Sequence, residues 1–223
     1  MSRSDTGSAW VRRRYDAVGL TQSPPGPHLA ALQEKHGTTG GTVLLGIDVS
    51  NSMSGRRLHL AKEGGKQFLG EAVAARYECG LVLWNHDVHR YVRPEPSGSA
   101  AVSALRRAHS TGGTDLVPCL RLARKVLGPM TGDRVLCLFS DGEFGHRGKC
   151  RQLARELCAT GVRIIVRGLG SRTAGALAEL ACPGLPDDQS VIRTEEAIGT
   201  GIASMAATMT GLTARRPRMG DDR

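Results

Sequence analysis

The sequence predicts an α/β fold in which a doubly wound, mostly parallel sheet carries one antiparallel edge strand. Two observations lead to this fold class. From residue 42 onward, short apolar runs alternate with stretches of helical periodicity, and this alternation is typical of βαβ units. Only three residues, Asn85 to Asp87, separate the second run from the third. Because three residues suit a hairpin, the third strand should be antiparallel and lie at an edge.

The individual elements follow from the same patterns. Apolar runs of four to eight residues that end in polar or small residues indicate buried strands. These strands are predicted at residues 42–48, 78–84, 88–92, 134–140, 163–169 and 190–192. The stretches between them predict helices at residues 58–75, 100–108, 116–127, 149–159, 174–181 and 195–208.

Composition divides the chain into three parts. Residues 1–40 are rich in helix breakers and form an N-terminal extension, residues 41–210 form one domain, and residues 211–223 form a disordered basic tail.

Aromatic residues make up only 4% of the 223 residues, so the core should be aliphatic. No segment resembles a signal peptide or a membrane span, and we expect a cytoplasmic protein. Its six cysteines form no C-x-x-C pair and are expected to be reduced.

The charge balance indicates an acidic partner without identifying it. Lys and Arg number 30 against 21 Asp and Glu, which gives a formal net charge of +9. Nucleic acid, an anionic membrane and an acidic protein would all be attracted. The basic residues are spread along the chain, as is typical of solvated surfaces.

Polar residues follow two of the predicted strands and precede one helix. "GIDVSNSMSG" places Asp48, Ser50 and Ser52 after the first strand, "FSDGE" places Asp141 after the fourth, and "STGGTDL" places Thr114 in a glycine turn. Ligands of doubly wound sheets bind beyond the carboxyl ends of the strands. We therefore expect these three loops to converge on one point.

The chemistry of the five side chains indicates a hard cation. Two carboxylates and three hydroxyls offer only oxygen, which suits Mg²⁺, with Mn²⁺ or Ca²⁺ as alternatives. The absence of sulfur and imidazole argues against zinc. Taken singly, each element has a simpler explanation, because Ser50 or Thr114 could cap a helix and Asp141 could begin an ordinary turn.

The combination resembles a known family. "DVSNS", the Thr of "GGTD" and the Asp of "SDGE" are similar in order and spacing to the metal-ion-dependent adhesion site of the von Willebrand factor A (vWA) domain, and the resemblance covers residues 41–210. It implies that Ser50, Ser52 and Thr114 bind the metal directly and that Asp48 and Asp141 act directly or through water. The last coordination position is then left for an Asp or Glu of a partner.

The same resemblance implies a function. It indicates a non-enzymatic protein-binding module of the stand-alone intracellular bacterial type, an adaptor in an ATPase-linked, stress or defence system. Four cations near the loops, Arg56, Arg57, Arg147 and Lys149, should make the rim of the site positive unless Asp115 and Glu143 both lean inward. The sequence does not indicate the oligomeric state.

Two other functions stay open at this point. One is a nucleic-acid-associated basic protein with a structural metal site, although no recognised nucleic-acid motif occurs. The other is a metal-dependent phosphatase or nuclease, for which Asp115 and Glu143 would have to supply further carboxylates. Neither a P-loop nor a G-x-S-x-G elbow is present in the sequence.

Overall fold

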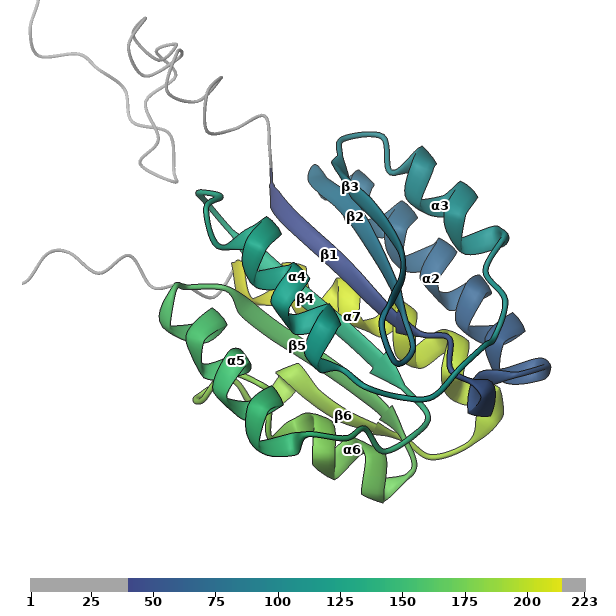
Figure 1. Cartoon of the computed structure of the whole chain (residues 1–223). Helices are drawn as coiled ribbons and strands as arrows, with labels where there is room; N and C mark the ends of the chain where they lie inside the picture. The colour runs from purple at the N-terminus through teal and green to yellow at the C-terminus, as the bar shows by residue number, and fades with distance from the viewer. Residues whose placement is uncertain (1–39, 214–223) are drawn as a thin grey trace, which may run out of the picture. The chain divides into compact units, whose positions relative to one another are not determined.

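The computed structural model describes residues 40–213, so the expected N-terminal extension and most of the expected tail lie outside the described residues. Six strands form one sheet in the order β3-β2-β1-β4-β5-β6. Every neighbouring pair is parallel except β2 and β3, as Figure 1 shows. The predicted fold class is confirmed. The strands are β1 (Gly41–Asp48), β2 (Tyr77–Trp84), β3 (Val88–Glu95), β4 (Arg134–Ser140), β5 (Arg163–Leu169) and β6 (Gln189–Ile192).

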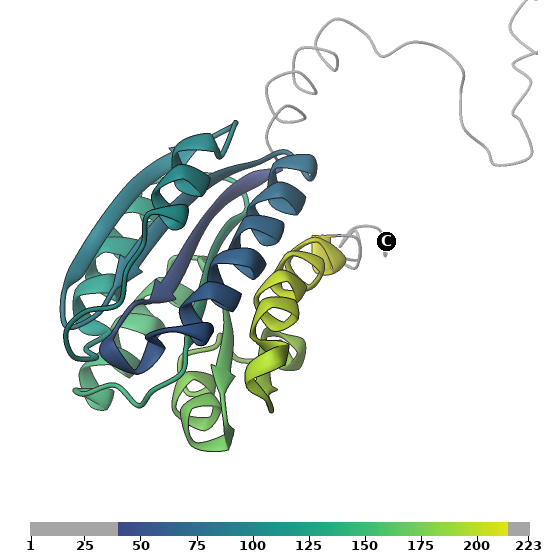
Figure 2. The same ribbon diagram turned by 90° about the vertical axis from the view of Figure 1, so that its right-hand side faces the viewer.

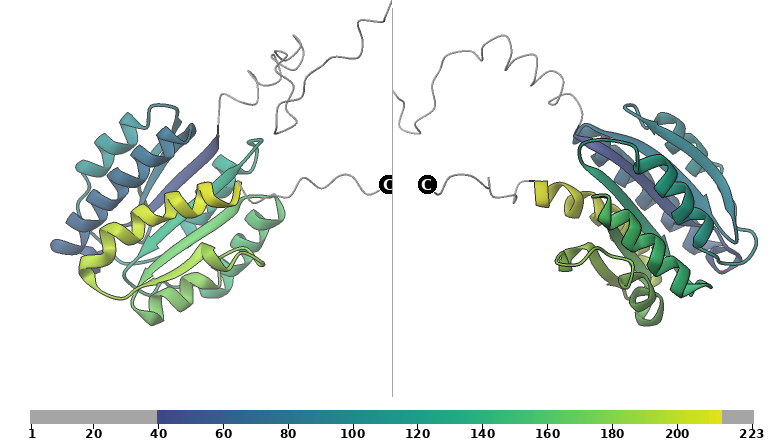
Figure 3. Two further views of the ribbon diagram at one scale, coloured as in Figure 1. Left: turned by 180° about the vertical axis from the view of Figure 1, so that it is seen from behind. Right: turned by 60° about the vertical axis from the view of Figure 1, so that its left-hand side comes forward.

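Helices cover both faces of the sheet, and each layer has its own apolar cluster. α2, α3 and α7 share one cluster with the sheet, and α4, α5 and α6 share the other; Figures 2 and 3 show the two layers. The helices are α2 (Arg56–Ala74), α3 (Ser99–Arg106), α4 (Val117–Leu127), α5 (Arg147–Ala159), α6 (Ser171–Ala178) and α7 (Ile198–Thr213), with short 3₁₀ segments η1 (Asn51–Met53), η2 (Pro186–Asp188) and η3 (Glu195–Ala197).

Strand β1 is buried on both faces, which explains its continuous apolar sequence. Val43, Leu45 and Ile47 pack toward the α2 and α7 side, whereas Leu44 packs toward the α4 and α5 side. Its position between β2 and β4 brings the end of the strand into the middle of the carboxyl edge of the sheet. The first charged side chain of β1, Asp48, lies at this end.

Helices α2 and α7 approach each other through glycine. A Cβ on Gly64 of α2 would lie 2.3 Å from the carbonyl oxygen of Gly199 in α7. No side chain fits between the two backbones there. Glycine at position 64 is therefore required by the packing of this pair.

Several predicted bounds change: α2 begins at Arg56 and α6 at Ser171, both earlier than predicted, and β3 continues to Glu95. Helix α7 continues to Thr213, so three residues assigned to the tail are helical. Helix α5 begins at Arg147, two residues earlier than predicted.

The expectation of six reduced cysteines is wrong for two of them. Cys158 at the end of α5 and Cys182 after α6 form a disulfide, because the two helices bring their Cα atoms to 5.7 Å. Among the described helices, none has the length and apolarity to cross a membrane.

Candidate functional site

Asp48 lies at the centre of the predicted site and is fully buried. One carboxylate oxygen accepts the Ser50 backbone N–H at 2.8 Å. The other accepts the Ser140 hydroxyl at 2.6 Å. No Lys or Arg of the described residues forms an ion pair with Asp48. Asp48 is therefore a buried carboxylate that neutral donors hold in a fixed orientation.

A chain of oxygen atoms runs from the first loop to the third. The hydroxyl oxygens of Ser50 and Ser52 lie 3.0 Å apart. The Ser52 hydroxyl then donates to one carboxylate oxygen of Asp141 at 2.7 Å. The pairing of β1 with β4 places these residues together, because Ile47 lies opposite Phe139 and both strands end within the next residue. Four of the five predicted residues thus belong to one connected group.

Thr114 reaches the same place from the second loop. A Cβ on Gly142 would lie 3.5 Å from the Ser52 hydroxyl oxygen and 3.9 Å from that of Thr114. Both hydroxyls therefore lie beside the small space over Gly142. The expectation that the three loops converge is confirmed by these contacts, whereas the role of the five residues as metal ligands stays a prediction.

Asn85 fixes the second loop, and sequence reasoning missed it. Its side-chain N–H donates to the Thr111 backbone carbonyl at 2.9 Å. Its backbone carbonyl accepts the Asp115 N–H at 2.7 Å. Thr111 also donates its N–H to the Val49 carbonyl at 2.8 Å. Asn85 is itself buried, so these bonds are shielded from water. The loop that carries Thr114 is thereby fastened to the ends of β1 and β2.

Burial controls the charge of Asp48. Removal of the carboxylate from water raises the pKa of Asp48 from 3.8 to about 6, although the hydrogen bonds from Ser140 and Ser50 oppose the shift. The nearby negative charge of Asp141 raises it further. At neutral pH the ionised carboxylate therefore lies in surroundings that disfavour its charge, and a bound cation would relieve this.

Arg57 binds the second carboxylate of the site. Its guanidinium donates to Asp141 at 2.7 Å and to Glu195 at 3.1 Å. Hydrogen bonding to Asp141 raises the pKa of Arg57. The guanidinium thus shares Asp141 with the Ser52 hydroxyl and connects the site to η3, the segment that leads into α7.

The cations expected to make the rim positive are mostly paired with carboxylates. Three of the four rim cations are paired with carboxylates: Arg56 with Glu196 at 3.5 Å, Arg57 with Asp141 and Glu195, and Arg147 with Glu143 at 3.3 Å. The fourth, Lys149, donates to Gln152. Two of these acids, Glu195 and Glu196, lie in η3 at the start of α7, and Glu195 is 138 residues from Arg57 in the sequence. Their proximity could not be seen in the sequence.

Ser140 is a further residue that the sequence reasoning missed. It is buried, donates its hydroxyl proton to Asp48 at 2.6 Å, and accepts the Gly142 N–H at 3.2 Å. A signal was present, because a serine ends the apolar run of β4 directly before Asp141. Within the described residues no group of three or more His, Cys, Asp and Glu is arranged to hold a metal ion. Any metal at this site would therefore depend on the hydroxyls.

Comparisons with known proteins support the domain type. The family model of the von Willebrand factor type A domain matches residues 43–143, a range that includes all five predicted residues. A search of curated proteins found no match.

Several solved structures have the same fold at low identity. The vWF domain of the type V pili tip protein Mfa5 from Porphyromonas gingivalis aligns with a TM-score of 0.67 and 15% identity over 83% of this chain and 99% of its own. The conserved hypothetical protein BatB from Bacteroides thetaiotaomicron aligns with a TM-score of 0.64 and 18% identity over 78% and 98%.

A von Willebrand factor type A protein from Catenulispora acidiphila aligns with a TM-score of 0.60 and 19% identity, over 77% of this chain and 43% of its own. At such identities these likenesses establish the fold alone. Residues 43–143 therefore carry the sequence pattern of a von Willebrand factor type A domain, and the described part of the chain has the vWA fold.

Proposed function

We propose that this protein is a non-enzymatic binding module that uses a divalent cation to hold an acidic residue of a partner protein. Asp48, Ser50, Ser52, Thr114 and Asp141 would hold the cation, with Mg²⁺ as the expected ion and Mn²⁺ or Ca²⁺ as alternatives. The observation that carries the proposal is the hydrogen-bonded chain in which Asp48 accepts the Ser50 backbone N–H and the Ser50, Ser52 and Asp141 side-chain oxygens contact one another in turn.

The spacing of the oxygens supports a small, hard cation. Octahedral Mg²⁺ has bond lengths of about 2.0–2.1 Å, so that neighbouring ligand oxygens lie about 3 Å apart. The distances of 3.0 Å between the two serine oxygens and 2.7 Å between Ser52 and Asp141 are close to this value. Little rearrangement of these side chains would be needed for them to share one ion.

The charges support the same proposal. Asp48 is a buried carboxylate without a cationic partner among the described residues, and such a group is costly unless a cation balances it. Asp141 has one cationic partner, Arg57. A divalent ion between the two carboxylates would balance both, and when bound it would supply an electrophilic centre for a carboxylate oxygen of the partner.

The family supports binding over catalysis. vWA domains commonly mediate protein–protein interactions, and two of the similar structures come from a pilus tip protein and a pilus adhesin. The setting that we propose for this chain, a cytoplasmic bacterial adaptor in an ATPase-linked, stress or defence system, rests on the motif resemblance. The paired charges around the site offer no one-sign surface for phosphates and do not favour nucleic acid as the partner.

A capture experiment tests the proposal. The full chain, immobilised, is exposed to an extract of the source organism in Mg²⁺ or in EDTA, and bound proteins are identified by mass spectrometry. We expect a partner that is retained in Mg²⁺, released by EDTA and lost with the double variant Ser50→Ala, Thr114→Ala. Ser54→Ala is the matched control, because Ser54 is an exposed serine of the same loop outside the oxygen group. A partner that is retained equally in EDTA and by the double variant would contradict the proposal.

A further inference from the structure

Two arginines of β5 point to the same side of the sheet but have different surroundings. Arg163 and Arg167 are four residues apart on a strand, so their side chains share the face covered by α7. The guanidinium of Arg163 binds both carboxylate oxygens of Asp188 and the carbonyls of Thr208 and Met209. Its charge is thus balanced by a buried carboxylate.

Arg167 has no carboxylate among its hydrogen-bond acceptors. It is only 3% exposed, and all its acceptors are neutral. They are the carbonyls of Val166 at 2.9 Å and Asp188 at 3.1 Å, and the hydroxyls of Thr208 at 2.8 Å and Ser204 at 3.4 Å. A guanidinium has five N–H donors, so four bonds leave one donor on the terminal nitrogens.

This difference in acceptors shifts the pKa values of the two arginines in opposite directions. Burial lowers the pKa of Arg167 below its usual range. Burial acts in the same direction on Arg163, but the hydrogen bonds and charge of Asp188 outweigh it and raise the pKa of Arg163. The charge of Asp188 acts on Arg167 as well, but its carboxylate oxygens accept hydrogen bonds from Arg163, whereas Arg167 reaches only the Asp188 backbone carbonyl.

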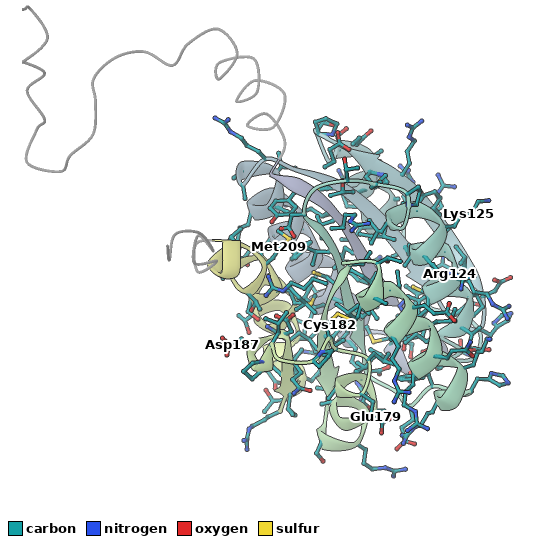
Figure 4. The ribbon with its side chains drawn as sticks, turned by 90° about the vertical axis from the view of Figure 1, so that its left-hand side faces the viewer. Arg124, Lys125, Glu179, Cys182, Asp187 and Met209 are labelled. Atoms are coloured by element: carbon teal, nitrogen blue, oxygen red, sulfur yellow. A yellow bond between two sulfur atoms is a disulfide. The ribbon has the colours of Figure 1, made fainter. Side chains whose placement is uncertain are left out.

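The buried guanidinium of Arg167 borders a pocket of about 590 Å³. One wall comes from η2 and β6 with Asp187, Gln189 and Ser190, and the other comes from α7 with Thr208 and Gly211. Figure 4 shows Asp187 on this side of the domain, beside α7. The volume is within the range of small-molecule sites, and none of the five residues of the oxygen group lines the pocket.

We propose that this pocket is a binding site for a small molecule that carries a carboxylate group, with the Arg167 guanidinium as its counter-charge. A buried cation whose hydrogen-bond acceptors are all neutral is stabilised by an anion that reaches it. A carboxylate suits the site better than a phosphate, because the pocket has one cation and its rim carries the exposed carboxylate of Asp187. A single negative charge balances Arg167, whereas a doubly charged phosphate would exceed that charge and be repelled more strongly by Asp187.

Acetate is the probe for this proposal, and the test requires no substitution of the buried Arg167. The full chain is kept in EDTA, so that no anion can bind through a metal. Sodium acetate then replaces sodium chloride at constant ionic strength. The side-chain Nε–H signals of Arg167 and Arg163 are followed by ¹⁵N NMR. We expect a saturable shift of the Arg167 signal and no shift of the Arg163 signal.

Two exposed variants complete the test. Asp187→Asn removes the repelling charge and should tighten acetate binding by about 1.5- to fivefold, which is the range for an exposed charge pair. Asp87→Asn removes the same charge from the turn between β2 and β3, outside the pocket, and should leave acetate affinity unchanged. The proposal is overturned if acetate produces no saturable shift, if Asp187→Asn and Asp87→Asn behave alike, or if phosphate shifts the Arg167 signal and acetate does not.

Discussion

Replacement of Asp48 by Asn should stabilise the protein when no divalent cation is present, although it removes a central residue of the site. Burial raises the pKa of Asp48 from 3.8 to about 6, and each unit corresponds to about 1.4 kcal/mol. The ionised carboxylate therefore lowers the free energy of unfolding by about 3 kcal/mol at neutral pH. Asparagine carries no charge and avoids this cost.

The sign of the pH dependence follows from the direction of the shift. A carboxyl group whose pKa is raised by folding contributes stability below its unfolded pKa, and this contribution is lost as the pH rises through the folded pKa. The advantage of Asp48→Asn over the wild type should therefore grow from about 1 kcal/mol at pH 4.5 to about 3 kcal/mol at pH 7.5. Any constant effect of the altered hydrogen bonds cancels in this difference of about 2 kcal/mol.

Urea denaturation in EDTA at the two pH values measures the effect. Asp187→Asn is the control, because it removes an exposed carboxylate and should change stability by less than about 0.5 kcal/mol. Saturating Mg²⁺ should then stabilise the wild type but not Asp48→Asn. If the advantage of Asp48→Asn does not increase with pH in EDTA, the carboxylate is not the buried, unbalanced charge described above.

Two further substitutions test the ion pair at Asp141 and the close approach of α2 to α7. Arg57→Gln removes the guanidinium that competes for Asp141 and should tighten Mg²⁺ binding by about two- to fivefold in calorimetry, as expected for a partly exposed ion pair; weaker binding would mean that Arg57 assists the metal. Gly64→Ala places a Cβ 2.3 Å from the Gly199 carbonyl oxygen and should cost about 1–3 kcal/mol in urea denaturation. Gly70→Ala on the same helix meets open space and should stabilise by about 0.5–1 kcal/mol; equal effects of the two alanines would refute the close approach of α2 and α7.

Much of the fold could be predicted from the sequence because most strands are buried on both faces. A buried strand needs a continuous apolar run, and β1, β4 and β5 each have one. The edge strand β3 was predicted from the short connection that forces an antiparallel turn. The start of α5 was missed because His146, which has φ of 53°, ends the loop without the glycine that usually marks such a position.

The five oxygen-bearing residues of the site could be predicted because of where they lie in the chain. The five oxygen-bearing residues lie at the ends of neighbouring strands or next to them, so chain order alone brings them together once the sheet order is known. The partners from distant segments could not be predicted. Glu195 reaches Arg57 only through the packing of α7 against α2, and Cys158 reaches Cys182 only through the packing of α5 near α6. Such contacts depend on helix positions that local sequence patterns do not specify.

Direct titration of the protein with a divalent cation tests the central claim, which is that the five oxygen-bearing residues hold one metal ion. Calorimetry with Mn²⁺ should show one ion bound per chain of the wild type. The double variant Ser50→Ala, Thr114→Ala should bind at least about tenfold more weakly, because two ligand oxygens are lost, and Ser54→Ala should bind like the wild type. An absence of binding to the wild type at millimolar Mn²⁺, or equal binding by the double variant, would contradict the claim.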